Sequence, residues 1–278
     1  MNDCLSVAVL MSCYNRKERT LKCVESILSA SRGESSLRLT FYVWDDGSDD
    51  GTAEALKKMS DNIMVFKGSG NYYWSKSMNE VMKKAVQDDH DLYLMVNDDV
   101  LFYADSIETL ISDYLKSGGR CAIVGSMRYD GIFTYGGRDR YYNDIEPSGK
   151  LMKCRYANWN CFMIDRAVVQ KVGLICGKYE HAGGDFDYSC RMNRMGMDQY
   201  VASKYVGECE IDHAIPSYYN ADKRLLERLH LLFAPKGLPI RSFFRFHWVD
   251  KRLKGIVIAA YSYFLVLTKV IFISVWKR

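Results

Sequence analysis

Apolar and polar residues follow two different patterns along the first half of the chain. Short continuous apolar runs predict β-strands over 6–12, 37–44, 63–67, 92–97 and 122–126. Between these runs the apolar residues recur at helical spacing, as at Leu21, Val24 and Ile27, which predicts amphipathic helices. Strands that alternate with helices predict an α/β domain with a mostly parallel central sheet, flanking helices and right-handed crossovers.

The pattern loosens between about residues 129 and 155, where Gly, Tyr and charged residues predict loops and short antiparallel strands. A strand over 161–164, a helix that opens at Asp185 and ends near Gly196, and a strand leading to 211–217 follow. We therefore expect one domain over 1–221, with a first part over 1–127 and a second over 128–221, and a helical extension over 222–278.

The extension differs from the rest of the chain in charge. It holds twelve Lys and Arg against three Asp and Glu, a net charge of +9, and since the whole chain carries +4, residues 1–221 carry −5. Basic and aromatic residues precede an almost wholly apolar run from Gly255 to Trp276, a combination typical of an anchor on an anionic membrane surface. Lys269 interrupts the run before it reaches the ~20 residues of a spanning helix. A transmembrane helix and a soluble helix that forms a homodimer stay open as alternatives.

Nine cysteines without a CxxC pair favour reduced thiols over a disulfide framework, and their spacing to histidines fits no zinc site. The first residues lack the features of a signal segment. We therefore expect a cytoplasmic protein, peripherally associated with the inner face of the cell membrane, that does not bind nucleic acid.

Polar clusters follow three of the predicted strands. SCYNR closes the first strand, DDGSDDGT runs from Asp45 to Thr52, and NDDV runs from Asn97 to Val100. Loops at the carboxyl ends of such strands gather into one crevice, where converging carboxylates need a cation. Oxygen ligands of this kind suit Mg²⁺ or Mn²⁺, and Arg16 could pair with phosphate. Each cluster taken alone could also be an ordinary turn or helix entry.

Together these pieces resemble the family 2 glycosyltransferases with the GT-A fold, over about residues 7–213. SCYNR and DDGSDDGT look like that family's two nucleotide-binding strand ends, and NDDV looks like its DxD-type metal motif. The segment GSGNYYWSKSMN, residues 68–79, is similar to a donor-side segment of bacterial O-antigen and capsule enzymes of the rhamnosyl- and galactofuranosyl-transferase type. On this reading residues 1–127 form the nucleotide-binding part, and 128–221 form the acceptor-side part.

The resemblance implies roles for particular residues. The donor-binding set it implies is Ser12, Tyr14, Arg16, Asp45, Asp46, Trp74, Asn79 and Asp98. Asp99 would be the direct metal ligand, with Asp98 and His213 beside it. GGDFDYSCRM is similar to the family's EDxD segment, so Asp185 would be the catalytic carboxylate, although Gly184 stands where an acidic residue is usual. Trp159, Asp187 and His181 are the acceptor-side candidates.

Simpler structural roles stay open for these residues. Asp185 could only cap a helix, His213 could be an ordinary hydrogen-bonded residue, and both tryptophans could belong to the core. Asp185 would otherwise act as general base, and one displacement would invert the anomeric centre.

The sequence therefore predicts an inverting, metal-dependent glycosyltransferase. It would move a sugar from a UDP- or dTDP-sugar to a hydroxyl of a glycan or lipid-linked oligosaccharide of the bacterial surface. One alternative is a sugar-nucleotide nucleotidyltransferase, which would be expected to carry a Gly-rich triphosphate loop that SCYNRKERT lacks. A dinucleotide oxidoreductase is disfavoured because no GxGxxG follows a strand. The other alternative is a non-catalytic nucleotide-sugar-binding membrane scaffold.

Overall fold

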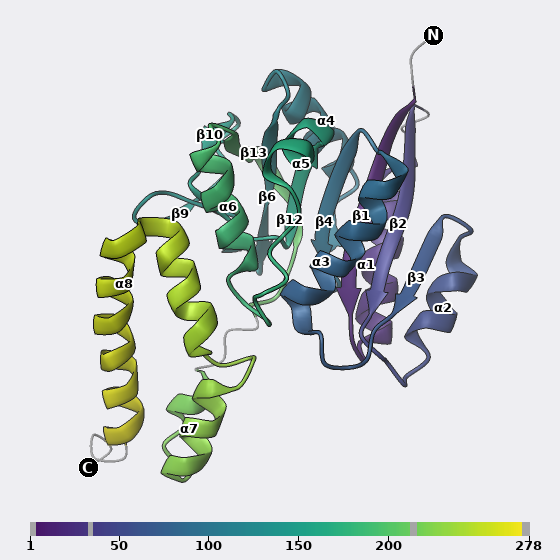
Figure 1. Cartoon of the computed structure of the whole chain (residues 1–278). Helices are drawn as coiled ribbons and strands as arrows, with labels where there is room; N and C mark the ends of the chain where they lie inside the picture. The colour runs from purple at the N-terminus through teal and green to yellow at the C-terminus, as the bar shows by residue number, and fades with distance from the viewer. Residues whose placement is uncertain (1–3, 33–35, 212–215, 274–278) are drawn as a thin grey trace.

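A twisted central sheet with helices on both faces forms the body of the protein (Figure 1). The computed structural model describes residues 4–32, 36–211 and 216–273. Eight of the strands follow the order β10-β13-β6-β12-β4-β1-β2-β3 across the sheet, while β5 pairs with β13 and β7 with β6. These strands are β1 Leu5–Cys13, β2 Leu37–Asp45, β3 Ile63–Lys67, β4 Leu92–Asn97, β5 Leu101–Phe102, β6 Cys121–Tyr129, β7 Ile132–Tyr135, β10 Met152–Lys153, β12 Cys161–Asp165 and β13 Asp198–Glu208. A small second sheet holds β8 Gly137–Arg138, β9 Asp144–Ile145 and β11 Tyr156–Ala157.

Helices cover the two faces of the sheet as two separate sets. The helices of the body are α1 Lys17–Ala30, α2 Thr52–Met59, α3 Tyr73–Ala85, α4 Ser106–Lys116, α5 Arg166–Val172 and α6 Gly184–Arg194, with a 3₁₀ turn at Val86–Asp88. Buried side chains of α1, α2 and α4 share one core cluster, and those of α3, α5 and α6 share the other. In β1 the side chains of Val7 and Val9 enter the first cluster and those of Ala8 and Leu10 the second, because successive residues of a strand point to opposite faces.

The register of the parallel strands brings the polar clusters together. β1 pairs in parallel with β2 and with β4, so that Ser12 lies opposite Asn97, and Cys13 lies opposite Asp45. The carboxyl ends of β1, β2 and β4 therefore lie side by side at one edge of the sheet, as expected for the ligand crevice of an open α/β sheet.

The α/β fold with a mostly parallel sheet and flanking helices is confirmed. The short strands β5, β7 and β10 are antiparallel, and one central strand also departs from the pattern: β12 lies antiparallel between β4 and β6 in the middle of the sheet. All five of its residues are buried, and the first four, residues 161–164, form a continuous apolar run. Such a run does not reveal strand direction, because parallel and antiparallel central strands bury the same faces.

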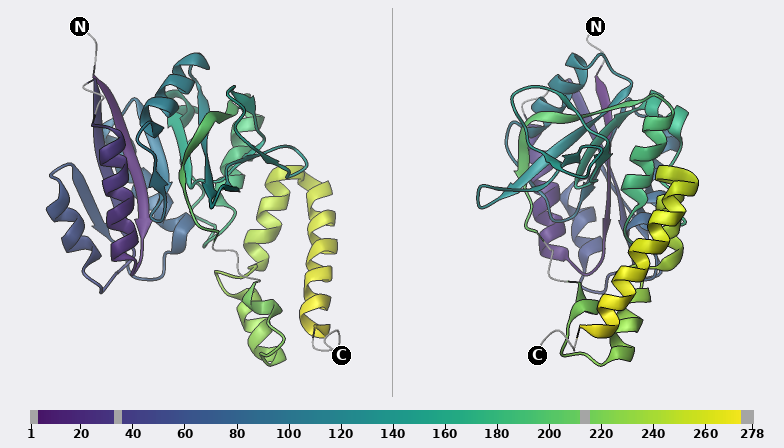
Figure 2. Two further views of the ribbon diagram at one scale, coloured as in Figure 1. Left: turned by 180° about the vertical axis from the view of Figure 1, so that it is seen from behind. Right: turned by 90° about the vertical axis from the view of Figure 1, so that its left-hand side faces the viewer.

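The C-terminal extension forms α7 Leu225–Phe233, preceded by a 3₁₀ turn at Ser217–Tyr219, and α8 Ile240–Phe272. α8 is not one straight helix, because Arg252 has a left-handed φ of 55° and folds the chain back on itself. The two arms of this hairpin lie side by side in Figure 1 and in the left view of Figure 2. Glycine is required at 255, since a Cβ there would lie 1.8 Å from the carbonyl oxygen of His247.

A buried carboxylate fastens the first arm of α8 to the body. Asp250 is 8% exposed, and it accepts hydrogen bonds from the Arg155 guanidinium at 3.1 Å and from the Tyr156 hydroxyl at 3.0 Å. Phe246 packs against Phe186 of α6, with ring centroids 6.2 Å apart. These contacts hold the first arm against α6.

Candidate active site

A cavity of about 730 Å³, called here the central cavity, opens where the carboxyl ends of β1, β2 and β4 meet. It is lined by Ser12, Cys13, Tyr14, Arg16, Asp46, Gly70, Tyr73, Trp74, Ser77, Asn97, Asp98, Asp99, Tyr135, Asn160, His181, Leu231, Ala234, Pro235 and Lys236. All three polar clusters of the sequence contribute to this wall, so the predicted convergence takes place.

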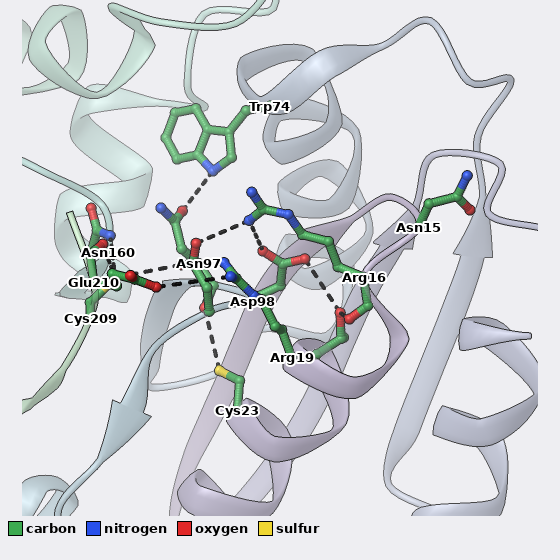
Figure 3. A network of polar contacts seen from close by, with 12 residues as sticks. Asn15, Arg16, Arg19, Cys23, Trp74, Asn97, Asp98, Asn160, Cys209 and Glu210 are labelled. Carbon is green, nitrogen blue, oxygen red and sulfur yellow. Dashed lines mark hydrogen bonds and ion pairs between the residues drawn. The ribbon is translucent and has the colours of Figure 1, made fainter. Parts of the chain in front are cut away.

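Arg16 joins the two carboxylates of the NDDV cluster, and Figure 3 shows its contact with Asp98. Its Nη1 lies 3.3 Å from Asp98 Oδ1 and 3.0 Å from Asp99 Oδ2. Asp98 also accepts a hydrogen bond from the Thr20 hydroxyl at 3.3 Å. Burial, and repulsion from Asp99, raise the pKa of Asp98 to about 6 in spite of these donors. The acidic pair therefore has a basic partner that its own segment does not contain.

The Asp98–Asp99 pair suits a divalent cation. Within residues 4–32, 36–211 and 216–273 no group of three or more His, Cys, Asp and Glu gathers around a common point. Two carboxylates are nevertheless the usual protein share for Mg²⁺ or Mn²⁺, whose shell is completed by phosphate and water. A cation would relieve the repulsion that raises the pKa of Asp98. His213, the other predicted metal ligand, lies outside the described residues.

The Asp46 carboxylate organises the loop that follows β3. It accepts hydrogen bonds from the backbone N–H groups of Gly70 at 3.0 Å, Tyr72 at 2.8 Å and Tyr73 at 3.2 Å. Gly68 lies so close that a Cβ there would be 2.4 Å from Asp46 Oδ1. Asp46 thus shapes the donor-side segment as well as lining the cavity. Asp45 is 2% exposed, accepts from the Ser48 N–H at 2.8 Å, and is not among the lining residues.

Trp74 and Trp159 occupy different positions. The Trp74 indole lines the cavity and donates to the Asn97 side chain at 2.8 Å, a contact drawn in Figure 3. Trp159 is 1% exposed and packs against Trp74, Phe162 and Tyr188 at centroid distances of 6.0, 5.1 and 5.1 Å. The structure therefore gives Trp159 a packing role behind Trp74, and only Trp74 faces the cavity.

Asp185 lies at the second position of α6, where its carboxylate accepts the Phe186 N–H at 2.9 Å. Burial raises the pKa of Asp185 to about 6, opposed by this N–H and by Arg138. At the neighbouring Gly184 a Cβ would lie 2.7 Å from Ser75 Oγ, so a larger residue there would require Ser75 to shift. Asp185 is not among the residues that line the central cavity, although His181, four positions before it, is.

Three other predicted residues differ in exposure and contacts. Asp187 is 2% exposed and is engaged by Arg191 at 2.8 Å and by the Tyr179 hydroxyl at 3.1 Å, so its carboxylate stabilises α6. Asn79 is buried and donates to a backbone carbonyl of the loop before α6. His181 lines the cavity, and burial together with the nearby cations Lys236 and Arg16 lowers the pKa of its imidazole.

The sequence reasoning missed one wall of the cavity. Leu231, Ala234, Pro235 and Lys236 belong to α7 and to the connection that follows it. No motif marks them, because a turn that folds back over a distant site leaves no local signal in the sequence. The extension is therefore part of the site as well as an appendage.

Comparisons with known proteins agree with this geometry. Residues 8–173, more than half of the chain, match the family described as glycosyl transferase family 2. The chain belongs to this family. No curated protein sequence is similar enough to count as a match.

Solved structures support the fold of this glycosyltransferase. The mannosyltransferase PcManGT from Pyrobaculum calidifontis, in complex with GDP-Man and Mn²⁺, gives a TM-score of 0.56 at 12% identity, over 98% of this chain and 87% of that one. Residues 1–349 of S. aureus TarS, in complex with UDP-GlcNAc, give a TM-score of 0.60 at 12% identity, over 97% of this chain and 90% of that one. At this identity the likeness shows the fold, which is the GT-A fold expected from the sequence.

Proposed function

We propose that this glycosyltransferase is an inverting, metal-dependent enzyme that moves a sugar from a UDP- or dTDP-sugar to a hydroxyl of a bacterial surface-polysaccharide acceptor. The observation that carries the proposal is the Asp98–Asp99 pair, which lies at a strand end in the wall of the central cavity. The neighbours solved with GDP-Man and Mn²⁺ and with UDP-GlcNAc support a nucleotide-sugar donor. A rhamnosyl or galactofuranosyl donor is the narrower form of the proposal.

The donor would lie along the strand ends. Tyr14 is 52% exposed at the cavity, so its ring is free to lie against a base, while Ser12 and Asp46 offer polar atoms to the nucleoside. Arg16 places its guanidinium beside Asp99, where it would pair with the diphosphate. A divalent cation on Asp98 and Asp99 would supply charge neutralisation for the departing diphosphate.

Activation of the acceptor would fall to Asp185, which is not among the lining residues of the central cavity but follows its wall residue His181 by four positions. The Asp185 carboxylate would take the proton of the acceptor hydroxyl while that oxygen bonds to the anomeric carbon and the bond to the diphosphate oxygen breaks. A base whose pKa is raised to about 6 binds a proton more tightly than an ordinary carboxylate and is still ionised near neutral pH. His181, with its lowered pKa, and Trp74 would form the sugar-facing wall. One displacement of this kind inverts the anomeric centre.

The extension, residues 222–278, would hold the enzyme at the cytoplasmic face of the membrane. The second arm of α8 exposes an apolar stripe: Leu253, Val257, Ile258, Tyr261, Phe264, Leu265 and Phe272. Of the described helices, only α8 is long and apolar enough to cross a membrane by composition. Its first arm carries Arg241, Arg245 and Asp250, so a spanning second arm would draw charged groups into the bilayer. An interfacial position keeps these charges in water.

The experiment is an assay for nucleoside diphosphate release from a panel of UDP-, dTDP- and GDP-sugars, with bacterial membrane lipids as the acceptor source. We expect release with at least one donor, its loss in EDTA and its recovery with excess Mn²⁺. Full activity in EDTA would contradict the metal assignment. An α-configured product from an α-configured donor, observed by NMR of the anomeric proton, would contradict inversion.

A further inference from the structure

The connection between α7 and α8, residues 234–239, is built to hold one shape at the cavity wall. The Gly237 N–H donates to the Ala234 carbonyl at 2.8 Å, and the Leu238 N–H donates to the Leu232 carbonyl at 2.7 Å. Gly237 is packed so closely that a Cβ would lie 2.1 Å from the Leu231 carbonyl oxygen. A backbone turned this tightly presents its side chains in fixed directions.

The second arm of α8 fixes this connection from outside. The Tyr263 hydroxyl donates to the Leu238 carbonyl at 3.0 Å, and its ring, 6% exposed, packs 5.5 Å from that of Phe243. The apolar arm therefore determines where the cavity-lining turn lies. Tyr263 therefore connects the apolar second arm, the proposed membrane contact, with the wall of the cavity.

Lys236 is the charged residue that this turn brings to the cavity. Within the described residues its ammonium group has no hydrogen bond and no carboxylate at ion-pair distance, whereas Arg16 across the cavity is held by Asp98 and Asp99. The charges of Lys236 and Arg16 both lower the pKa of the His181 imidazole, and all three residues line the central cavity. A Lys at a cavity wall without a protein anion is suited to an anionic ligand group.

We propose that Lys236 is a phosphate-binding residue, supplied to the active site by the C-terminal hairpin and positioned by Tyr263. This inference rests on the proposed function and deepens it. The phosphate belongs either to the diphosphate of the donor or to an acceptor linked to an isoprenoid through phosphate. In both cases the extension completes the site, so membrane docking and substrate binding use one structural unit.

The test compares Lys236→Met, which keeps the aliphatic stem and removes the charge, with Lys236→Arg, which keeps the charge. Lys223→Met is the matched control, because Lys223 is an exposed lysine of the same extension that does not line the cavity. Calorimetry measures binding of UDP, dTDP and GDP, and of farnesyl diphosphate as a short isoprenoid phosphate, to the full-length protein.

Loss of one charge-assisted contact should weaken phosphate binding about ten- to a hundredfold. If the donor supplies the phosphate, Lys236→Met weakens the nucleoside diphosphate and leaves uridine, thymidine or guanosine unchanged. If a lipid-linked acceptor supplies it, only farnesyl diphosphate is weakened. Lys236→Arg should recover most of the affinity in either case. Equal affinities of Lys236→Met and Lys223→Met for all the probes would overturn the proposal.

Tyr263→Phe tests the positioning role, since it removes the hydroxyl and keeps the ring. The same phosphate probe should lose several-fold in affinity while the nucleoside alone is unaffected, and an unchanged affinity would remove Tyr263 from the proposal. Failure of the proposed function has a different signature, because wild-type protein would then bind no nucleoside diphosphate. Binding by the wild type with no effect of Lys236→Met overturns the inference about Lys236 alone.

Discussion

Asp185→Asn is the substitution that separates a general base from a helix-capping residue. Asn keeps the size of the side chain and an oxygen that accepts the Phe186 N–H, so the start of α6 should persist. The substitution removes the proton affinity of the side chain, because an amide does not accept a proton near neutral pH. The N-cap of α6 is Gly183, so the alternative role of Asp185 is to stabilise the first turn through the Phe186 N–H. In that case most of the activity should remain, whereas a general base contributes about 10²- to 10⁴-fold to the rate.

The pKa of Asp185 predicts the pH dependence of this rate. Burial raises that pKa to about 6, so the carboxylate is about nine-tenths ionised at pH 7 and loses activity about tenfold per pH unit well below 6. Asp98 also has a pKa raised to about 6 and would produce a similar limb in kcat/KM. When donor and Mn²⁺ are saturating, the bound cation should keep Asp98 ionised. The acidic limb that remains in the pH profile of kcat then belongs to Asp185.

Asp187→Asn is the matched control, in the same turn of α6. Because Asp187 is buried against Arg191 and Tyr179, this change should lower the Tm and leave kcat within a few-fold. Asp185→Asn, in contrast, should lower kcat strongly and leave the Tm and the donor Kd little changed. A kcat of Asp185→Asn above about a tenth of wild type, or an unchanged acidic limb in kcat, would refute the assignment of Asp185 as base.

Two further predictions concern the extension. Asp250→Ala removes the hydrogen bonds that this buried carboxylate accepts from Arg155 and Tyr156. The free energy of unfolding should therefore fall by about 2 kcal/mol in urea titration, and α8 should become sensitive to protease. A change below about 0.5 kcal/mol, that of a surface pair, would show that this contact does not hold the extension. Replacement of both Val257 and Phe264 by Gln should release the protein from phosphatidylglycerol vesicles in a sedimentation assay. The control Ile132→Gln, at an equally exposed apolar site on the body, should not release it. Vesicle binding that survives the double substitution would contradict the anchor.

Much of the structure of residues 1–127 could be predicted from the sequence, because it is local. The strands 63–67 and 92–97 have the predicted bounds, and the predicted helix through Leu21, Val24 and Ile27 is α1, since continuous apolar runs and helical spacing reflect burial on the two faces of one sheet. Strand-end loops in such a sheet necessarily share one edge, so Ser12, Asp46 and Asp98 could be placed together without coordinates.

Features that depend on contacts between distant segments could not be predicted. Arg16 as partner of the acidic pair, Trp159 behind Trp74, and Lys236 on the cavity wall all depend on tertiary packing. The same holds for the break in α8: Arg252 has no helix-breaking side chain, and its left-handed φ fits a chain that turns back where Asp250 docks on the body. The apolar run after Gly255 therefore appeared as one segment in the sequence, while the structure makes it half of a hairpin.

The most direct test of the central claim is the Mn²⁺ dependence of donor binding. UDP-GlcNAc, GDP-Man and a dTDP-sugar are titrated into wild type and into Asp99→Asn by calorimetry, each with Mn²⁺ and with EDTA. We predict that at least one donor binds wild type at least about tenfold more tightly in Mn²⁺, and that Asp99→Asn removes this difference while leaving the weak binding in EDTA unchanged. Donor affinity that is the same in Mn²⁺ and EDTA for wild type, or a Mn²⁺ effect that persists in Asp99→Asn, would contradict the assignment of this cavity as a metal-assisted nucleotide-sugar site.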